Sequence, residues 1–93
     1  MTDPVKLLKT KLPQSSWKDA SAVANYFLRI LFPGEGKANL DQYHAQAMSY
    51  LNTGDDGVTS SPFTALVDTT SAYDLRVRGM VAMLMTFQRF QEQ

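Results

Sequence analysis

The closing segment, residues 72–93, constrains the fold more than any other part of the chain. Ser71 and Asp74 form a capping signature at its start, because the serine oxygen can accept a hydrogen bond from the first turn and the carboxylate favours the positive end of a helix. At 100° per residue, its apolar side chains gather on one arc. This arc contains Tyr73, Val77, Met80, Val81, Leu84 and Phe87, and it is widened by Met83 and Phe90. A helix that is apolar over more than half of its circumference has to be covered, by the other helices, by a second copy or by a larger body.

The opposite arc of the same helix is polar or small. It holds Arg78, Gly79, Ala82, Thr86 and Arg89. A glycine inside a helix costs roughly 1 kcal/mol relative to alanine. The grouping of Gly79 with Ala82 and Thr86 therefore predicts a groove in which another backbone approaches closely. The alternative is a surface glycine that the helix tolerates.

A first helix is expected over residues 17–32. Ser16 and Asp19 have the spacing of a capping box at its start. The apolar residues that follow recur at intervals of three and four, which is typical of one helix face. Pro33 and Gly34 end the pattern, because proline cannot continue a helix and glycine favours the turn after it.

A second helix is expected over residues 40–51, with Asn39 as its cap and a clear amphipathic pattern. Residues 52–57 have turn chemistry, since glycine and asparagine tolerate positive φ and aspartate closes turns on its own backbone. Ser61 is followed by a proline, which is the typical start of a helix. This pair predicts a short helix over residues 63–67.

The rest of the chain completes the fold class. Residues 1–15 are expected to be an N-terminal extension, in which Leu7, Leu8 and Leu12 indicate at most a short helical turn. Strand signals are nearly absent. We therefore expect an all-α protein: a small bundle of three main helices plus one short helix, built as a single helical domain over residues 16–93.

Composition narrows the classes of partner. Nine basic residues balance nine acidic ones in a chain of 93 residues, so no net field attracts nucleic acid or an anionic membrane. Cysteine is absent, which excludes disulfides and zinc–sulfur sites. No run approaches the roughly 18 apolar residues of a membrane span, and the N-terminus lacks an apolar stretch of signal-peptide length. The sequence leaves the cellular location open.

No residue constellation amounts to a catalytic, cofactor or metal site. His44, near Asp41 on the same helix, could be a general base or one metal ligand, but no second histidine or cysteine completes a site. Residues 52–57 faintly resemble a calcium loop, yet Phe63 stands where that loop needs a glutamate. Residues 34–37 are too short for a phosphate-binding loop and follow a helix instead of a strand. We expect a protein that is not an enzyme and binds no cofactor.

Three arginines form the main basic concentration. Arg76, Arg78 and Arg89, together with Tyr73, could contact an acidic partner or a nucleic-acid backbone. The alternative is a solvated helix face. A small helical nucleic-acid-binding domain is thus the second functional hypothesis, although six to seven residues between the first two helices exceed the 3–4-residue turn of a helix-turn-helix.

Apolar surface left over after folding predicts an interface. The helix over residues 17–32 has only a narrow polar strip, and the closing helix is apolar over a wide arc, so a three-helix domain covers neither readily. We expect a non-catalytic interaction module that forms a homodimer or docks on a larger protein, with Tyr26, Met85 and Phe90 at the interface. The alternative is that Leu7, Leu8 and Leu12 fold back over the exposed arc.

Three segments together resemble one protein family: ANYFLRILFPGEGKANL (residues 24–40), TSSPFTAL (residues 59–66) and AYDLRVRGMVAMLMTFQRFQEQ (residues 72–93). They are similar to the C-terminal end of a family of large bacterial exported proteins, a domain of unknown function whose chains finish on R-x-R-x-x-V-x-x-L and then F-Q. The resemblance covers residues 16–93 and implies the tail of a longer exported protein. It carries over no activity and no catalytic residues. The preceding body and a signal sequence are missing, which a separate gene product or an excised fragment would explain.

Overall fold

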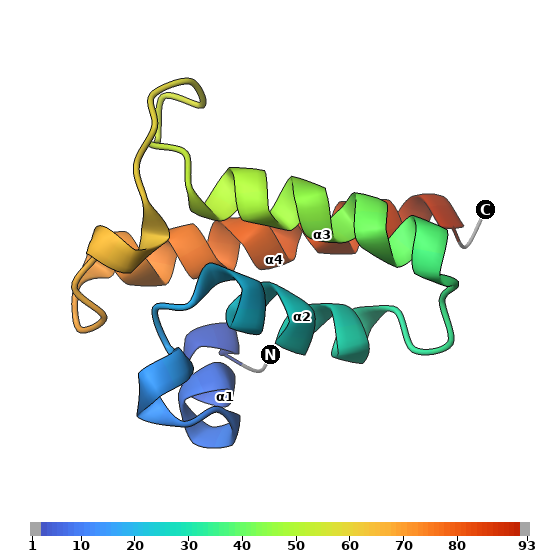
Figure 1. Cartoon of the computed structure of the whole chain (residues 1–93), viewed down its shortest axis with the longest axis horizontal. Helices are drawn as coiled ribbons and strands as arrows, with labels where there is room; N and C mark the ends of the chain where they lie inside the picture. Colours follow the sequence, from blue (N-terminus) through green and yellow to red (C-terminus); the bar gives the residue numbers. More distant parts are fainter. Residues whose placement is uncertain (1–2, 92–93) are drawn as a thin grey trace.

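The structure is a computed structural model that describes residues 3–91, with side chains for residues 3–89. The described part contains four α-helices and two 3₁₀ turns, and no strand. In chain order these are α1 (Pro4–Lys11), η1 (Gln14–Ser16), α2 (Ala20–Leu31), α3 (Lys37–Leu51), η2 (Phe63–Ala65) and α4 (Ser71–Gln91) (Figure 1). The all-α class is confirmed. The helices differ from the expected three main and one short, because the N-terminal segment forms a helix of its own and the expected short helix over residues 63–67 is a 3₁₀ turn.

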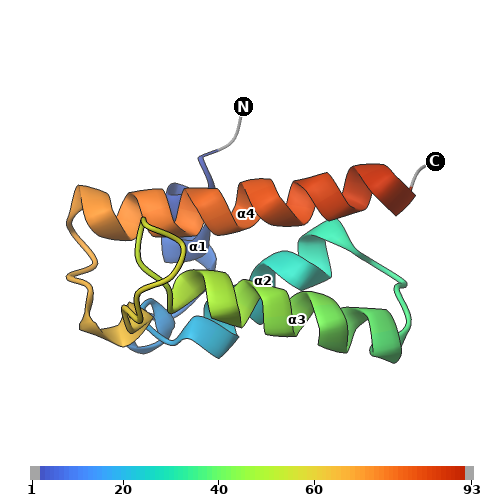
Figure 2. The ribbon, with the colours of Figure 1, turned by 90° about the horizontal axis from the view of Figure 1, so that it is seen from above.

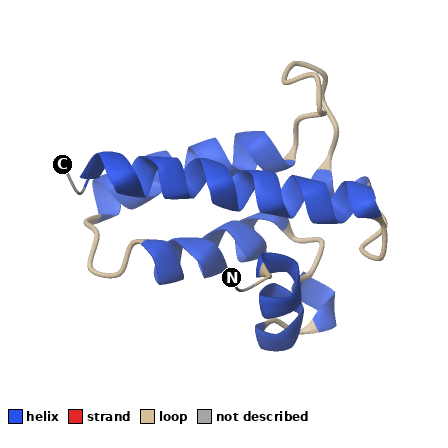
Figure 3. Ribbon diagram, turned by 180° about the vertical axis from the view of Figure 1, so that it is seen from behind, coloured by secondary structure: helices blue, strands red, loops and turns tan. Residues whose placement is uncertain are grey.

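The longest helix, α4, organises the molecule. It packs against α1, α2 and α3, while α2 and α3 pack on each other in antiparallel orientation. From above, α4 lies along one side of the molecule, overlapping α1, and α2 and α3 lie together on its other side (Figure 2). Seen from behind, α4 crosses the front of the molecule, and no other described helix covers its outward side (Figure 3).

The core lies where the four helices meet, and α1 contributes to it. Its buried apolar residues are Val5, Leu8, Ala20, Val23, Ala24, Phe27, Leu28, Phe32, Ala47, Leu51, Phe63, Tyr73, Val77, Met80 and Leu84. Leu12, at the end of α1, packs against this core. The N-terminal segment therefore folds back onto the bundle, as one of the two alternatives from the sequence expected.

The start of α1 is set by a cap that the sequence interpretation overlooked. The carboxylate of Asp3 accepts hydrogen bonds from the backbone N–H groups of Val5 at 2.9 Å and Lys6 at 3.4 Å. Pro4 occupies the first turn, where its missing N–H costs nothing. Asp-Pro is thus a helix start here, and the helix has two turns where at most one was expected.

The second helix, α2, begins at Ala20, so the expected start at residue 17 is wrong. Ser16 belongs to the turn η1, and Asp19 is the cap, accepting from the N–H of Ala22 at 3.1 Å. The indole N–H of Trp17 donates to the carbonyl of Leu12 at 3.0 Å. This bond holds Trp17 against the end of α1, so the helix starts three residues later.

The helix α3 begins earlier than expected, at Lys37, with Gly36 at its N-cap. Asn39 does not cap it, because its amide donates to the carboxylate of Glu35 at 2.7 Å. An exposed ion pair between Lys37 and Asp41, at 2.6 Å, lies along this extra first turn. Such i, i+4 pairs support the start of a helix by a few tenths of a kcal/mol.

The start of α4 and the turn before it also differ in detail. Thr70 supplies the capping oxygen, accepting from the N–H of Tyr73 at 3.4 Å, and Ser71 is already the first helical residue. In η2 the chain closes one 3₁₀ turn and then becomes extended at Leu66. The short helix expected over residues 63–67 therefore ends after Ala65.

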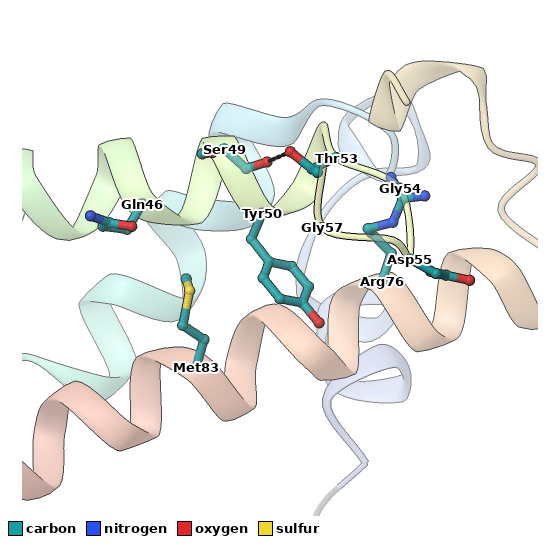
Figure 4. Close-up of a pocket in the computed structure, with 9 residues that line it drawn as sticks. All are labelled: Gln46, Ser49, Tyr50, Thr53, Gly54, Asp55, Gly57, Arg76 and Met83. Carbon is teal, nitrogen blue, oxygen red and sulfur yellow. Dashed lines mark hydrogen bonds between the residues drawn. The ribbon is translucent and has the colours of Figure 1, made fainter. Parts of the chain in front are cut away.

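Gly79 marks a close approach, made by a side chain and not by another backbone. The ring of Tyr50 points from α3 onto α4 (Figure 4). A methyl group at Gly79 would lie 2.7 Å from Cζ of Tyr50, well inside van der Waals contact. The missing side chain of Gly79 thus leaves room for the Tyr50 ring. The alternative of a surface glycine without a packing role is therefore wrong.

We expect Gly79→Ala to change the free energy of unfolding very little, because two effects of opposite sign offset each other. Alanine favours the helix by about 1 kcal/mol, but its methyl displaces the Tyr50 ring, which is 38% exposed and can swing outward. In a Tyr50→Ala background, the same substitution should stabilise by about 1 kcal/mol. Urea melts of the four proteins measure this coupling. An equal effect of Gly79→Ala in both backgrounds would show that the ring does not need the space.

Candidate interaction surface

The inward side of α4 is fixed by close packing. Tyr73, Val77, Met80 and Leu84 are fully buried. The hydroxyl of Tyr73 donates to the carbonyl of Trp17 at 2.6 Å, and its ring stacks on Phe63 at 5.2 Å. Burial, together with nearby acidic groups, raises the pKa of this hydroxyl far above its ordinary value. The rotation of α4 about its own axis is therefore set, and so is the side that it turns outward.

Arg76 belongs to the interior and is not available to an external partner. Its exposed fraction is 8%. The guanidinium donates to the carbonyl of Leu51 at 2.8 Å, to the carbonyl of Ser61 at 3.0 Å and to the hydroxyl of Ser61 at 3.1 Å. It thereby joins the end of α3 and the end of the following loop to α4. The sequence predicted that Arg76 either contacts an external partner or lies on a solvated helix face, and both predictions are wrong for this residue.

Five exposed residues make up what we call the outward face of α4. They are Leu75, Arg78, Ala82, Met85 and Arg89. Their spacing alternates between three and four residues, which places them within an arc of about 80° on the helix. Leu75 is 62% and Met85 42% exposed. Alternating spacing of this kind is the pattern of the a and d positions through which helices pair.

Charge is distributed unevenly around this face. Asp74 lies in the first turn of α4, beside Leu75, and Arg89 lies in its last turn. Arg78, between them, is paired with Asp3 at 2.9 Å, and both side chains are more than two-fifths exposed. The outward face is therefore flanked by an acidic group at one end, carries a basic group at the other and has a neutralised pair between them.

The Asp3–Arg78 pair also connects α1 to α4. Burial raises the pKa of the Asp3 carboxyl, but the Arg78 guanidinium and the N–H groups of Lys6 and Val5 lower it by more, so that the pKa lies below its ordinary value. A carboxyl whose pKa is lowered by folding stabilises the fold above its unfolded pKa, and this contribution is lost as the pH falls through the folded pKa. The pair is exposed and contributes little on its own.

The other residues nominated from the sequence lie elsewhere. Tyr26, on α2, is half-buried against the core, with its ring edge-to-face on Phe27 at 5.1 Å. Burial raises the pKa of its hydroxyl, and the charge of Arg29 lowers it by less. The side chain of Phe90 lies outside the described residues. Of the three expected interface residues, Met85 lies on the outward face of α4.

Leu75 was missed by the sequence interpretation, although a signal for it exists. At 100° per residue it falls on the same arc as Ala82 and Thr86, which that interpretation treated as polar or small. A leucine on the polar arc of a helix whose other side is packed is a candidate for contact with a second molecule. Leu75 is more exposed than Met85, so the rest of the bundle does not cover it.

Two hollows lined by described residues bring polar side chains together without a complete set for nucleophilic catalysis. One hollow, of about 830 Å³, lies between α2 and α3, where Oγ of Ser21 is 3.1 Å from Nε2 of His44. The Asn25 amide donates to the same hydroxyl at 3.4 Å, and Asp41 is paired with Lys37. The described contacts give His44 no carboxylate partner to orient it, as a serine–histidine nucleophile requires. Another hollow, of about 250 Å³, lies between α3 and α4 beside Arg76 (Figure 4).

Metal binding and membrane insertion find no support in residues 3–91. Nowhere in that stretch do three or more histidine, cysteine, aspartate or glutamate side chains come together as a potential metal site. None of its helices combines the length and the apolar character needed to cross a bilayer.

Comparison with known proteins does not assign this chain to a family. No family model, no curated protein and no solved structure matches this chain.

Proposed function

We propose that this chain is a non-catalytic helical interaction module that self-associates through the outward face of α4. The observation that carries the proposal is the exposure of Leu75 and Met85, at 62% and 42%, on a helix whose inward side is fully packed. Fully burying a leucine or methionine side chain is favourable by about 1.5–3 kcal/mol. Two such residues per copy support a weak and reversible interface.

Nucleic-acid binding is the less favoured function. It rests on three arginines, but Arg76 is buried against backbone carbonyls and Arg78 is paired with Asp3. A neutral chain also lacks the field that gathers phosphates. Of the three arginines, Arg89 alone is neither buried nor given an ion pair among the described contacts, and a single arginine supports no phosphate-binding surface.

The resemblance to the C-terminal end of large exported bacterial proteins supports an extension of this proposal. A domain in that position would dock on the body of its own parent protein or on a second copy. Both occupants need an uncovered helix face, and the outward face of α4 is such a face. The resemblance itself stays a prediction.

Concentration-dependent NMR spectra test the proposed function. On dilution from about 500 μM to about 20 μM, a range that spans weak association, the amide signals of residues 75, 78, 82, 85 and 89 should shift most. The Leu75→Glu/Met85→Glu variant should fold normally, because both sites are exposed, and should lose these shifts.

The matched control is the Val58→Glu/Val67→Glu variant, which changes two residues that are 86% and 58% exposed but lie outside α4. It should keep the concentration dependence of the parent protein. Spectra that do not change with concentration, or changes that map to α3 alone, would contradict the proposal.

A further inference from the structure

We propose that the self-association pairs two α4 helices in antiparallel orientation, with a two-fold axis between Arg78 and Ala82. This inference rests on the proposed function and specifies its geometry. In this arrangement Leu75 of each copy packs against Met85 of the other. Arg78 of each copy lies over Ala82 of the other, where a long side chain meets a small one.

The register follows from the spacing of the outward face. In an antiparallel helix pair, each a-position residue lies opposite a d-position residue of the other helix. Leu75 and Ala82 occupy one of these positions, and Arg78 and Met85 the other. One register places the two large exposed apolar residues opposite each other, and by two-fold symmetry it does so twice. A parallel pair would instead place Arg89 against Arg89, which repels, and would form no ion pair with Asp74 of the other copy.

Charge complementarity identifies the occupant as a second copy. The same antiparallel register places Arg89 of one copy at the first turn of the other copy's α4, where Asp74 flanks the face. Two such pairs form by symmetry, one at each end. The helix α4 thus supplies both members of each ion pair, Arg89 from the outward face and Asp74 from its edge, as a self-complementary interface needs.

The outward side of α4 is also accessible to a second helix. No other described helix covers it (Figure 3), and α1 lies to one side, held by the Asp3–Arg78 pair. The proposed axis runs perpendicular to both α4 helices, so it leaves the two α1 helices on the same side of the pair and reverses their positions along it.

Disulfide trapping tests the orientation, and the absence of native cysteine makes each introduced thiol unique. Ser71→Cys and Arg89→Cys are the probes, because they leave Leu75 and Met85 intact and the mixed dimer keeps one of its two Asp74–Arg89 pairs. In the proposed pair, Ser71 of one copy faces Arg89 of the other, whereas like residues lie about 27 Å apart at 1.5 Å per residue. Mixing the two variants in a glutathione redox buffer should give the mixed disulfide, and each variant alone should give no more dimer than Ala45→Cys, an exposed control on α3.

A charge exchange tests the ion pairs independently. Asp74→Arg and Arg89→Asp should each weaken dimerisation roughly tenfold, since each disrupts both symmetric pairs, and the combined variant should restore it. Urea melts of the three variants show whether the fold itself is affected.

The outcomes separate this inference from the proposed function. Homotypic disulfides of Ser71→Cys would establish a parallel pair and overturn the inference while leaving self-association intact. A dimer in sedimentation that gives no mixed disulfide would place the interface elsewhere and overturn it as well. A chain that stays monomeric at every concentration would overturn the proposed function and this inference together.

Discussion

Replacing Arg76 by alanine is expected to lower the free energy of unfolding by about 3 kcal/mol. The guanidinium is buried and donates to two carbonyl oxygens and one hydroxyl, from Leu51 and Ser61. Truncation leaves the buried carbonyl of Leu51 and the half-buried oxygens of Ser61 without their donor, and it opens a cavity between α3, the loop and α4. Urea unfolding followed by circular dichroism at 222 nm measures the loss, 222 nm being about the wavelength at which α-helix is monitored.

Arg89→Ala is the matched control, because it removes the same side chain from the same helix at an exposed position. Its effect on unfolding should stay within about 0.5 kcal/mol. Arg76→Lys should fall between the two, since lysine keeps the charge but cannot reach all three acceptors with a planar fork. Equal losses for Arg76→Ala and Arg89→Ala would mean that the clamp between the loop and α4 does not contribute to stability.

Leu8→Ala is expected to destabilise the protein by about 3 kcal/mol. Leu8 is fully buried although it lies in the N-terminal segment, where it packs into the common core. Removing its isobutyl group leaves a cavity that the surrounding helices fill only in part. The free energy of unfolding of the full chain, from urea melts, is the quantity to measure.

Lys6→Ala, at an exposed position on the same short helix, controls for helix propensity. It should be nearly neutral. A loss well below 1 kcal/mol for Leu8→Ala would indicate that α1 detaches easily from the bundle and that residues 1–15 behave as an extension.

The helix α4 could be predicted from the sequence because its signals are local. A wide apolar arc and a polar cap are properties of neighbouring residues, and the structure starts α4 at Ser71, one residue before the expected position. The same local rules misplaced the starts of α2 and α3. At α2, Ser16 and Asp19 are both suited to cap the helix, and Asp19 does so while Trp17 bonds to the carbonyl of Leu12. At α3, Asn39 bonds to Glu35, and Gly36 stands at the N-cap without a side-chain bond.

The helix α1 could not be predicted from local sequence signals. Its eight residues are too few to be stable alone. Contacts with distant residues hold it: the Nζ of Lys9 donates to the carbonyl of Asp68 and lies 5.1 Å from the ring centre of Tyr73, and Asp3 pairs with Arg78. A local reading of residues 1–15 contains none of these partners.

The candidate surface was predictable only in part, for a related reason. Periodicity places Met85 at the edge of the apolar arc, and the structure finds it exposed. Periodicity alone does not distinguish the buried Arg76 from the exposed Arg78 and Arg89, because burial depends on the carbonyls of Leu51 and Ser61 that surround Arg76. Leu75 became a candidate once the packing of α4 fixed which side faces outward.

Sedimentation equilibrium of the unmodified chain tests the central claim most directly. Over a concentration series that reaches about 100 μM, we expect a reversible monomer–dimer equilibrium in which the average mass rises above the 10.4 kDa of one chain. The Leu75→Glu/Met85→Glu variant should stay at the mass of one chain in the same series. A parent protein that also stays at 10.4 kDa at every concentration would contradict the account.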